Sequence, residues 1–380
     1  MPNQIIPASL DRRSFLRYGG VAAGAVGTTA LLAACSGTSS TGSSGSTSSG
    51  AAANFGTIAV QLSWIKNIEF AGEYFATENG YYKKAGFDSV DLLAGGSGST
   101  TAEEIIISGK ALVGLSSPIG TAPSIIKGAP LKVIATTYQK NPFCLMSLKE
   151  GTPISTVAEL KGKRIGVQAG ANQTIVDGFL KANGLSKSDV TIVTTGFDIA
   201  PLISGKYDAH MSYTTNEPIL AASEGKTPVL LTFADNGLPF VAETFTVLQD
   251  TIDSKRDLLK AYLKAEIQGW TDAVKDPAKS AELAANKYGK GANFGKDLDV
   301  GEQTKEATAQ NALILTPDVN TNGLFTMTQD LIDENIKSLK AMGYDITADK
   351  LFDLSILDDV YKENPDLKTT FTIPSASTSS

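Results

Sequence analysis

The chain has 380 residues, which is enough for two or three domains of ordinary size, and its 42% hydrophobic and 19% charged residues are typical of a globular protein. The net charge of −7, with no cluster of Lys or Arg beyond residue 20, argues against a general nucleic-acid binder, which needs clustered cations. One His and two Cys exclude a multi-His metal site, a thiolate zinc site and a disulfide-rich scaffold, and they argue against His-centred catalysis.

The first 34 residues have the features of an export signal. Residues 11–17 read Asp-Arg-Arg-Ser-Phe-Leu-Arg, a twin-arginine signature, and a weakly apolar stretch follows that is too short to span a membrane. It ends Leu-Ala-Ala-Cys at Cys35, which resembles a bacterial lipobox in which Cys35 is lipidated. The alternative is a poorly hydrophobic anchor with an accidental Cys. The order of the features favours a lipoprotein signal peptide over residues 1–34.

A polar spacer follows over residues 35–54. Residues 36–53 are all Ser, Thr, Gly or Ala and carry no charge, so they cannot bury enough apolar surface to offset their ordering entropy. A coil of this length has an end-to-end distance of roughly 25 Å. We expect it to act as a flexible tether between the lipid and a folded body.

From residue 55 the pattern alternates between strands and helices. The predicted strands of the first half are 56–62, 88–93, 111–115 and 131–138, and the helices are 70–79, 100–108 and 121–127. The same alternation of strands and helices repeats further along the chain. Its predicted strands are 162–168, 190–194, 207–212 and 229–233, and its helices are 171–183, 199–204 and 217–224. The remainder has helical periodicity over 256–275, 277–288, 307–313 and 323–342.

This alternation of strands and helices predicts an α/β fold with two lobes, each built on a mostly parallel sheet. Pro and polar residues mark two crossings, near 138–142 and 233–240, which would form a two-segment hinge. Lobe 1 would comprise residues 55–138 plus 240–372, lobe 2 residues 139–239, and residues 373–380 a polar tail. Ligand sites in such folds lie beyond the carboxyl ends of the strands, here between the lobes.

Four stretches carry a family resemblance. They are Leu-Ser-Trp-Ile-Lys-Asn-Ile-Glu-Phe-Ala-Gly-Glu-Tyr at 62–74, Asn-Gly-Tyr-Tyr-Lys-Lys-Ala-Gly-Phe at 79–87, Glu-Leu-Lys-Gly-Lys-Arg-Ile-Gly-Val-Gln at 159–168, and Gly-Lys-Tyr-Asp-Ala at 205–209 with Tyr-Thr-Thr-Asn-Glu-Pro at 213–218. In order and spacing they resemble the solute-binding lipoproteins of ABC importers that bind thiamine pyrimidine precursors and, more distantly, alkylsulfonates. The resemblance implies a periplasmic-binding-protein type II-like fold.

Two positions depart from the family pattern, which often reads Trp-x-Pro-Asn-x-x-His-Ala-Gly-x-Tyr in the first stretch. Lys66 replaces the Pro and Phe70 replaces the His. Fungal pyrimidine synthases on the same fold use a His at the position of Phe70 and a Cys-rich loop, and this chain has neither. The resemblance therefore implies binding and not enzymatic synthesis.

Two candidate ligand-binding residues follow the first predicted strand. Trp64 could stack on a flat heteroaromatic ring, although core packing is the alternative. Asn67 offers both a donor and an acceptor, which suits a ring nitrogen beside an amine, and it could equally cap the next helix.

Three candidates lie beyond a strand of the second lobe. The carboxylate of Glu217 could accept hydrogen bonds from an amine or ring N–H, or could simply favour the helix that begins there. Tyr213 could form a second aromatic wall or belong to the core, and Asn216 stands between these two. Weaker candidates are Ser117, Tyr138 and Asn172, which also lie at or beyond strand ends. Cys144 and His210 are expected to be core residues.

The sequence thus predicts a binding protein of an ABC importer that captures a small heteroaromatic solute between two lobes. The best guess for this solute is a thiamine pyrimidine precursor such as an aminopyrimidine. Its expected partners are the solute, a permease with its cytoplasmic ATPase, and the outer face of the cytoplasmic membrane through Cys35. It is expected to be a monomer without nucleic acid, cofactor or metal. The alternatives are a binder of an alkylsulfonate, a flavin or another nitrogen heterocycle, or an exported enzyme on the same fold.

Overall fold

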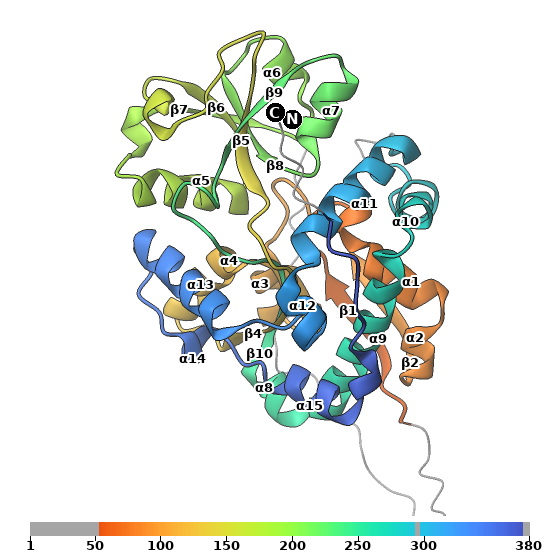
Figure 1. Cartoon of the computed structure of the whole chain (residues 1–380). Helices are drawn as coiled ribbons and strands as arrows, with labels where there is room; N and C mark the ends of the chain where they lie inside the picture. Colours follow the sequence, from red (N-terminus) through yellow and green to blue (C-terminus); the bar gives the residue numbers. More distant parts are fainter. Residues whose placement is uncertain (1–52, 293–296, 375–380) are drawn as a thin grey trace, which may run out of the picture. The chain divides into compact units, whose positions relative to one another are not determined.

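The computed structural model describes residues 53–292 and 297–374, which belong to one compact unit (Figure 1). The predicted export signal, Cys35, almost all of the spacer and the end of the polar tail lie outside the described residues. Within the described ranges, no helix has the length and apolarity needed to span a membrane.

The first lobe is built on a five-stranded mixed sheet of order β2-β1-β3-β10-β4. β1 runs parallel to both β2 and β3, whereas β10 is antiparallel to β3 and β4. The strands are β1 (Gly56–Gln61), β2 (Phe87–Leu93), β3 (Val113–Ser116), β4 (Leu131–Tyr138) and β10 (Ala242–Leu248).

The second lobe repeats this arrangement in the order β7-β6-β8-β5-β9. β6 is parallel to β7 and β8, and β5 is antiparallel to β8 and β9. The strands are β5 (Phe143–Leu148), β6 (Arg164–Gln168), β7 (Thr191–Thr195), β8 (Ala209–Tyr213) and β9 (Pro228–Thr232). In each sheet the antiparallel strand is the one that enters from the other lobe, so the chain crosses twice, as a two-segment hinge requires.

Helices flank both sheets (Figure 1). Those around the first sheet or following it are η1 (Ile68–Phe70), α1 (Ala71–Glu78), α2 (Tyr81–Lys84), α3 (Ala102–Ile107), α4 (Pro118–Ile126), α8 (Gln249–Ser254), α9 (Arg256–Ala273), α10 (Pro277–Leu283), η4 (Ala284–Tyr288), α11 (Val300–Ile314), α12 (Pro317–Asn322), α13 (Gln329–Ala341), α14 (Ala348–Leu351), α15 (Ser355–Glu363) and η5 (Pro365–Leu367). The second lobe has η2 (Val157–Leu160), α5 (Ala171–Ala182), η3 (Lys187–Asp189), α6 (Ala200–Ile203) and α7 (Glu217–Ser223).

Three expectations from the sequence need correction. The mostly parallel sheets are mixed, because β5 and β10 were not predicted as strands. The helix expected over 307–313 extends to Val300–Ile314, since the Asp299 side chain caps its start. The helix expected from residue 323 begins only at Gln329, because Thr328 caps it and Phe325 has a φ of 71°, which is incompatible with a helix.

One large core packs around the first sheet. It buries Tyr74 of α1 together with Tyr262 and Trp270 of α9, and the α9 backbone approaches α1 so closely that a Cβ at Gly269 would lie 2.2 Å from the Gly72 carbonyl oxygen. A second core packs around the other sheet and includes Phe179 of α5. Leu339 of α13 joins this second core, so the helical remainder contacts both lobes. The predicted lobe boundaries remain a prediction.

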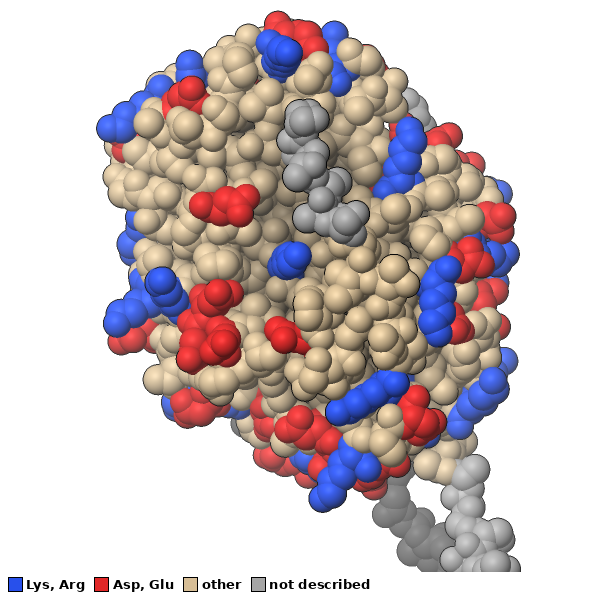
Figure 2. Space-filling model, in the orientation of Figure 1, with Lys and Arg blue, Asp and Glu red and all other residues tan. Residues whose placement is uncertain are grey.

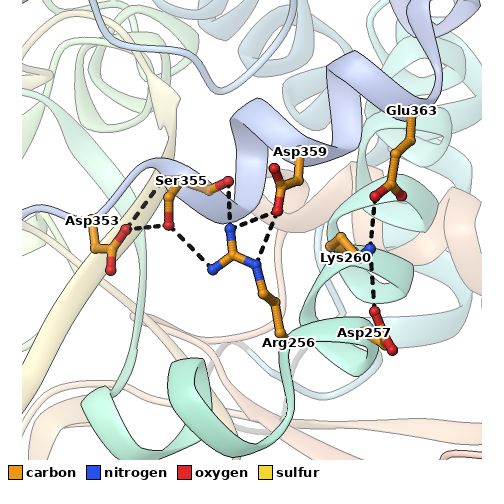
Figure 3. Close-up of polar contacts among 7 residues, drawn as sticks. All are labelled: Arg256, Asp257, Lys260, Asp353, Ser355, Asp359 and Glu363. Carbon is orange, nitrogen blue, oxygen red and sulfur yellow. Dashed lines mark hydrogen bonds and ion pairs between the residues drawn. The ribbon is translucent and has the colours of Figure 1, made fainter.

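An ion-pair network fixes the C-terminal helix α15 to the long helix α9 (Figure 3). The Arg256 guanidinium donates to Asp359 Oδ2 from Nη2 at 2.6 Å and from Nε at 2.9 Å, and also to the carbonyl of Ser355. Lys260 bridges Asp257 and Glu363 on the same two helices. These contacts lie on the outside of the first lobe, where water weakens them, so the buried face of α15 is expected to contribute more.

The surface seen in Figure 2 carries basic and acidic side chains interspersed, with no basic stripe on that face.

Candidate functional site

A cavity of about 110 Å³ lies where the two lobes meet. An apolar protein cavity of about 150 Å³ is known to hold one benzene molecule, so the space matches a single six-membered ring. The first lobe contributes residues that follow β1 and β3, the start of α3 and the start of β10, and the second contributes residues that follow β6 and β8. The polar and aromatic lining residues include Ser63, Trp64, Glu69, Ser99, Thr101, Glu103, Ser116, Ser117, Phe143, Asn172, Tyr213, Asn216, Glu217 and Glu243.

Aromatic side chains supply part of the wall. Trp64 stands just beyond β1 and its ring meets Phe197 of the second lobe edge-on, with centroids 4.6 Å apart. Tyr213 ends β8, and its ring packs edge-on against Phe143 at 4.7 Å. Flat rings on both lobes suit a flat ligand.

Four glutamates line the same cavity, whereas no Lys, Arg or His is among its lining residues. They come from four elements: Glu69 from η1, Glu103 from α3, Glu217 from the first turn of α7 and Glu243 from β10. None forms an ion pair with another described residue. The cavity therefore concentrates acidic groups without neutralising them.

Glu217 is held in place by the backbone that precedes it. Its Oε2 accepts a hydrogen bond from the Tyr213 amide at 2.8 Å, and Pro218 fixes the start of α7 behind it. Burial raises the pKa of Glu217 to about 8, although backbone hydrogen bonds partly oppose that shift. At neutral pH this carboxyl group is largely protonated.

Glu243 adopts an unusual backbone conformation, with a φ of 50°. Its Oε2 accepts from the Ser63 hydroxyl at 2.7 Å and its Oε1 from the Tyr213 hydroxyl at 3.2 Å. Burial, reinforced by the nearby charge of Glu69, raises the pKa of Glu243 to about 8. A non-glycine residue in the left-handed region is commonest at functional sites, where the surrounding structure holds it.

Glu69 is 5% exposed, and burial raises its pKa to about 7. Asn67 Nδ2 donates to its Oε1 at 3.0 Å, while its Oε2 accepts no hydrogen bond from any described residue. Just behind the lining, Glu306 of α11 accepts from Asn216 Nδ2 at 2.8 Å, and burial holds its pKa well above the usual range.

The structure brings most of the predicted site residues together. Those that line the cavity are Trp64, Ser117, Asn172, Tyr213, Asn216 and Glu217. Asn67 and Tyr138 do not line it. Asn67 is buried and caps η1, since its Oδ1 accepts from the Glu69 amide, and the Tyr138 hydroxyl donates to Gln310 Oε1 in the core of the first lobe.

Sequence reasoning missed Glu69, Glu103 and Glu243. Glu69 lies two residues after Asn67, inside the quoted family stretch, and its charge in an otherwise apolar run was a usable signal. Glu243 could have been found only after β10 was recognised. β10 is antiparallel, so its beginning lies beside the carboxyl end of the neighbouring β3.

The two residues assigned to the core are buried. His210 is hydrogen-bonded to Gln168 and to the Tyr207 hydroxyl, and burial lowers its pKa to about 4, so it is neutral. Cys144 is a buried free thiol, and burial raises its pKa well above the usual range. Across residues 53–292 and 297–374, no group of three or more His, Cys, Asp or Glu side chains is arranged to hold a metal ion.

The chain is similar in sequence to two kinds of named protein. It is 27% identical to the riboflavin-binding protein RibY of Chloroflexus aurantiacus over 270 residues, which is 67% of this chain and 74% of RibY. It is 26% identical to a 4-amino-5-hydroxymethyl-2-methylpyrimidine phosphate synthase of Schizosaccharomyces pombe over 219 residues, 54% of this chain and 62% of that enzyme. The match therefore covers less than two thirds of the synthase.

Solved structures show the same fold at low sequence identity. A ligand-binding component of an ABC-type import system from Staphylococcus aureus superposes with a TM-score of 0.59 at 12% identity, covering 80% of this chain and 98% of that one. The alkanesulfonate-binding protein SsuA of Xanthomonas axonopodis pv. citri gives 0.56 at 15%, covering 78% and 96%. The chain has the α/β fold of ABC-importer solute-binding proteins. A family model described as NMT1/THI5 like matches residues 67–280, and the chain belongs to this family.

Proposed function

We propose that this chain is the extracytoplasmic solute-binding component of an ABC importer and that it captures a small nitrogen heteroaromatic solute. The best guess is a thiamine pyrimidine precursor such as an aminopyrimidine. The observation that carries the proposal is the cavity between the lobes, which is the size of one ring, has aromatic walls and is lined by four glutamates with no cation. Such a lining suits a flat ligand rich in N–H donors.

Capture would proceed by closure of the lobes about the two crossings. Hydrogen bonds already join the lobes around the cavity, from Asn216 to Glu306 and from Tyr213 to Glu243. A ligand held by residues of both lobes adds to these contacts only when the lobes are closed. It therefore shifts an open–closed equilibrium toward the closed form, which would dock on the permease.

Discrimination among solutes would rest on polar pairing. A carboxyl group that is buried by closure and left without a donor costs about 1–3 kcal/mol. Glu217 offers an acceptor to an exocyclic amine, and Glu69 and Glu243 lie in the same lining. A ligand without matching donors would leave these groups unpaired and would bind weakly.

The acidic lining disfavours an anionic solute. A sulfonate would find no Lys, Arg or His among the lining residues to pair with its charge. A flavin is favoured by the similarity to RibY, which is named as a riboflavin-binding protein. We therefore rank a flavin second among the ligands.

An exported enzyme is the competing function, and the named synthases among the relatives favour it. Against it, the single His of the chain is buried in the second lobe, and Phe70 is a buried core residue. Mixing the purified protein with candidate pyrimidines and searching for product by mass spectrometry tests this point. Turnover would overturn a binding-only function.

The location follows from the sequence features outside the described residues. We propose export by the twin-arginine route, lipidation at Cys35 and residence as a monomer on the outer face of the cytoplasmic membrane, beside a permease with its ATPase. A lipid label tests the anchor, with a Cys35→Ser variant as the matched control. If the wild-type chain does not incorporate the label, the proposed lipidation of Cys35 is contradicted.

Thermal-shift screening of the purified protein against aminopyrimidines, flavins and alkylsulfonates tests the ligand. We expect an aminopyrimidine to raise the melting temperature, because a ligand that binds only the folded state stabilises it by mass action. An unchanged melting temperature with pyrimidines, beside an increase with another class, would contradict the ligand assignment.

A further inference from the structure

Three carboxyl groups that are distant in sequence converge on one cavity. Glu69, Glu217 and Glu243 are each less than 9% exposed, and all three line the space between the lobes. Oε2 of Glu69 has no hydrogen-bond donor among the described residues although the side chain is buried. This oxygen is not among the fully buried unpaired atoms, so it can be reached from the cavity and is free to accept a hydrogen bond from a bound molecule.

The surroundings of these groups offer no positive charge. Beyond the effect of burial, the charge of Glu69 raises the pKa of both Glu217 and Glu243. The three glutamates in turn add to the effect of burial and raise the pKa of acidic groups on the neighbouring elements: Glu73 and Tyr74 of α1, Tyr138 of β4, Cys144 of β5, Tyr207 before β8, Tyr213 of β8 and Glu306 of α11. None of the seven ion pairs between described residues involves a lining glutamate. No cationic side chain of the described residues therefore neutralises these carboxyl groups.

We infer that the cavity takes its ligand as an organic cation and that binding releases protons from the lining carboxyl groups to solvent. This inference rests on the proposed function and deepens it, because it assigns the ligand a charge. In the binding step a carboxyl O–H breaks and its proton passes to the buffer. The ligand keeps its own proton, and its N–H donates to the resulting carboxylate, so charge inside the cavity is conserved.

The geometry suits a planar nitrogen cation. An aminopyridinium or protonated aminopyrimidine carries its charge over a ring N–H and an exocyclic amine, which can donate to two carboxylate oxygens at once. Trp64 and Tyr213 both line the cavity, and the face of an aromatic ring attracts a cation within about 6 Å.

The direction of the pH effect follows from the raised pKa values of Glu69, Glu217 and Glu243, which lie at about 7 to 8. Below that range the groups are protonated and a cation must displace the protons, so affinity falls as the pH falls. For each proton displaced, affinity changes by up to about tenfold per pH unit. Above about pH 8 the affinity should level off.

The test is isothermal titration calorimetry of the full chain with two single-ring probes of the same shape. 4-Aminopyridine is a cation between pH 6 and 8, and aniline is neutral there. Titrations at several pH values, each in two buffers of different ionisation enthalpy, measure both the affinity and the number of protons released. We expect 4-aminopyridine to release about one proton or more at pH 7 and to bind at least about tenfold more tightly than aniline.

Two matched variants show where the protons come from. Glu69→Gln should reduce the number of protons released by 4-aminopyridine. Glu266→Gln removes an equally buried carboxyl group that does not line the cavity, so it should leave that number unchanged.

The outcomes separate this inference from the proposed function. Binding of 4-aminopyridine without proton release, or with the affinity of aniline, overturns the inference alone. If neither probe nor any heterocycle of the thermal-shift panel binds, both the inference and the proposed function are contradicted.

Discussion

The structure buries two sets of glutamates in different surroundings. Glu69 and Glu243, with Glu217 from the other lobe, line the cavity. Glu73 of α1 and Glu266 of α9 are fully buried in the core behind it, where Tyr82 donates a hydrogen bond to Glu266. Burial raises the pKa of the carboxyl groups in both sets.

The comparison shows that a raised pKa does not by itself identify a binding site. Glu73 and Glu266 interact with each other inside one lobe, and no ligand can reach them without unfolding of the helices. The cavity glutamates come from both lobes and share their space with Trp64 and Tyr213. A candidate site is therefore recognised by side chains that a ligand can reach and that come from several elements. Burial alone does not distinguish it from a pair of carboxyl groups in the core.

The largest predicted effect concerns the core pair and is on stability. The pKa of Glu266 is raised from 4.5 to about 7, so its stabilising contribution is fully present below pH 4.5 and is lost as the pH rises through 7. Glu266→Gln removes this loss. We expect the variant to be more stable than wild type by roughly 3 kcal/mol at pH 8 and nearly equal to it at pH 4.

Urea unfolding at both pH values measures this difference, and Glu282→Gln on the exposed surface of α10 is the control. Equal stability of Glu266→Gln and wild type at pH 8 would show that burial does not oppose the ionisation of Glu266.

The second prediction concerns Glu217. Glu217→Gln keeps the shape of the side chain but cannot become an anion, so a cationic ligand loses a charge-assisted hydrogen bond. We expect the affinity for 4-aminopyridine to fall about thirtyfold, equivalent to about 2 kcal/mol. Calorimetry measures it, with Glu266→Gln as a variant that should bind as wild type does. If Glu217→Ala binds the ligand with wild-type affinity, the proposal that Glu217 contacts the ligand is contradicted.

The third prediction concerns the aromatic wall. Trp64→Leu keeps an apolar side chain and removes the ring face, which should weaken ligand binding about fivefold, or about 1 kcal/mol. Trp64→Phe should recover part of this loss. If Trp64→Leu and wild type bind with the same affinity in the calorimeter, the wall does not contact the ligand.

The smallest effect is expected on the outside of the first lobe. Arg256→Met removes the guanidinium that joins α9 to Asp359 of α15 (Figure 3). Because both side chains are 38% exposed, we expect a loss of stability of at most about 1 kcal/mol and no change in ligand affinity. A larger loss in urea unfolding would show that α15 depends on this contact more than on its buried face.

The sequence predicted the alternating fold, and it placed candidate site residues where strands end. Trp64 follows β1, and Tyr213 and Glu217 stand at or beyond the end of β8. Position together with the family resemblance made them candidates, and all three line the cavity. Glu243 could not be placed, because its strand enters from the other lobe and runs antiparallel. That relation depends on long-range pairing, which no local pattern in the sequence contains.

Two candidate residues were misplaced for a different reason. Asn67 and Tyr138 both stand near strand ends, but each side chain turns to a partner within the first lobe. Capping and core hydrogen bonds compete with ligand contacts for the same polar groups, and the sequence does not show which of them occurs.

The central claim is that a nitrogen heterocycle binds between the lobes and pairs with the cavity glutamates. A crystal structure of the protein grown with 4-aminopyridine tests it most directly. The account predicts the ring between Trp64 and Tyr213, with its nitrogens within hydrogen-bonding distance of Glu217 and of Glu69 or Glu243. A ring bound elsewhere on the surface, or inside the cavity without contact to any of these glutamates, would contradict it.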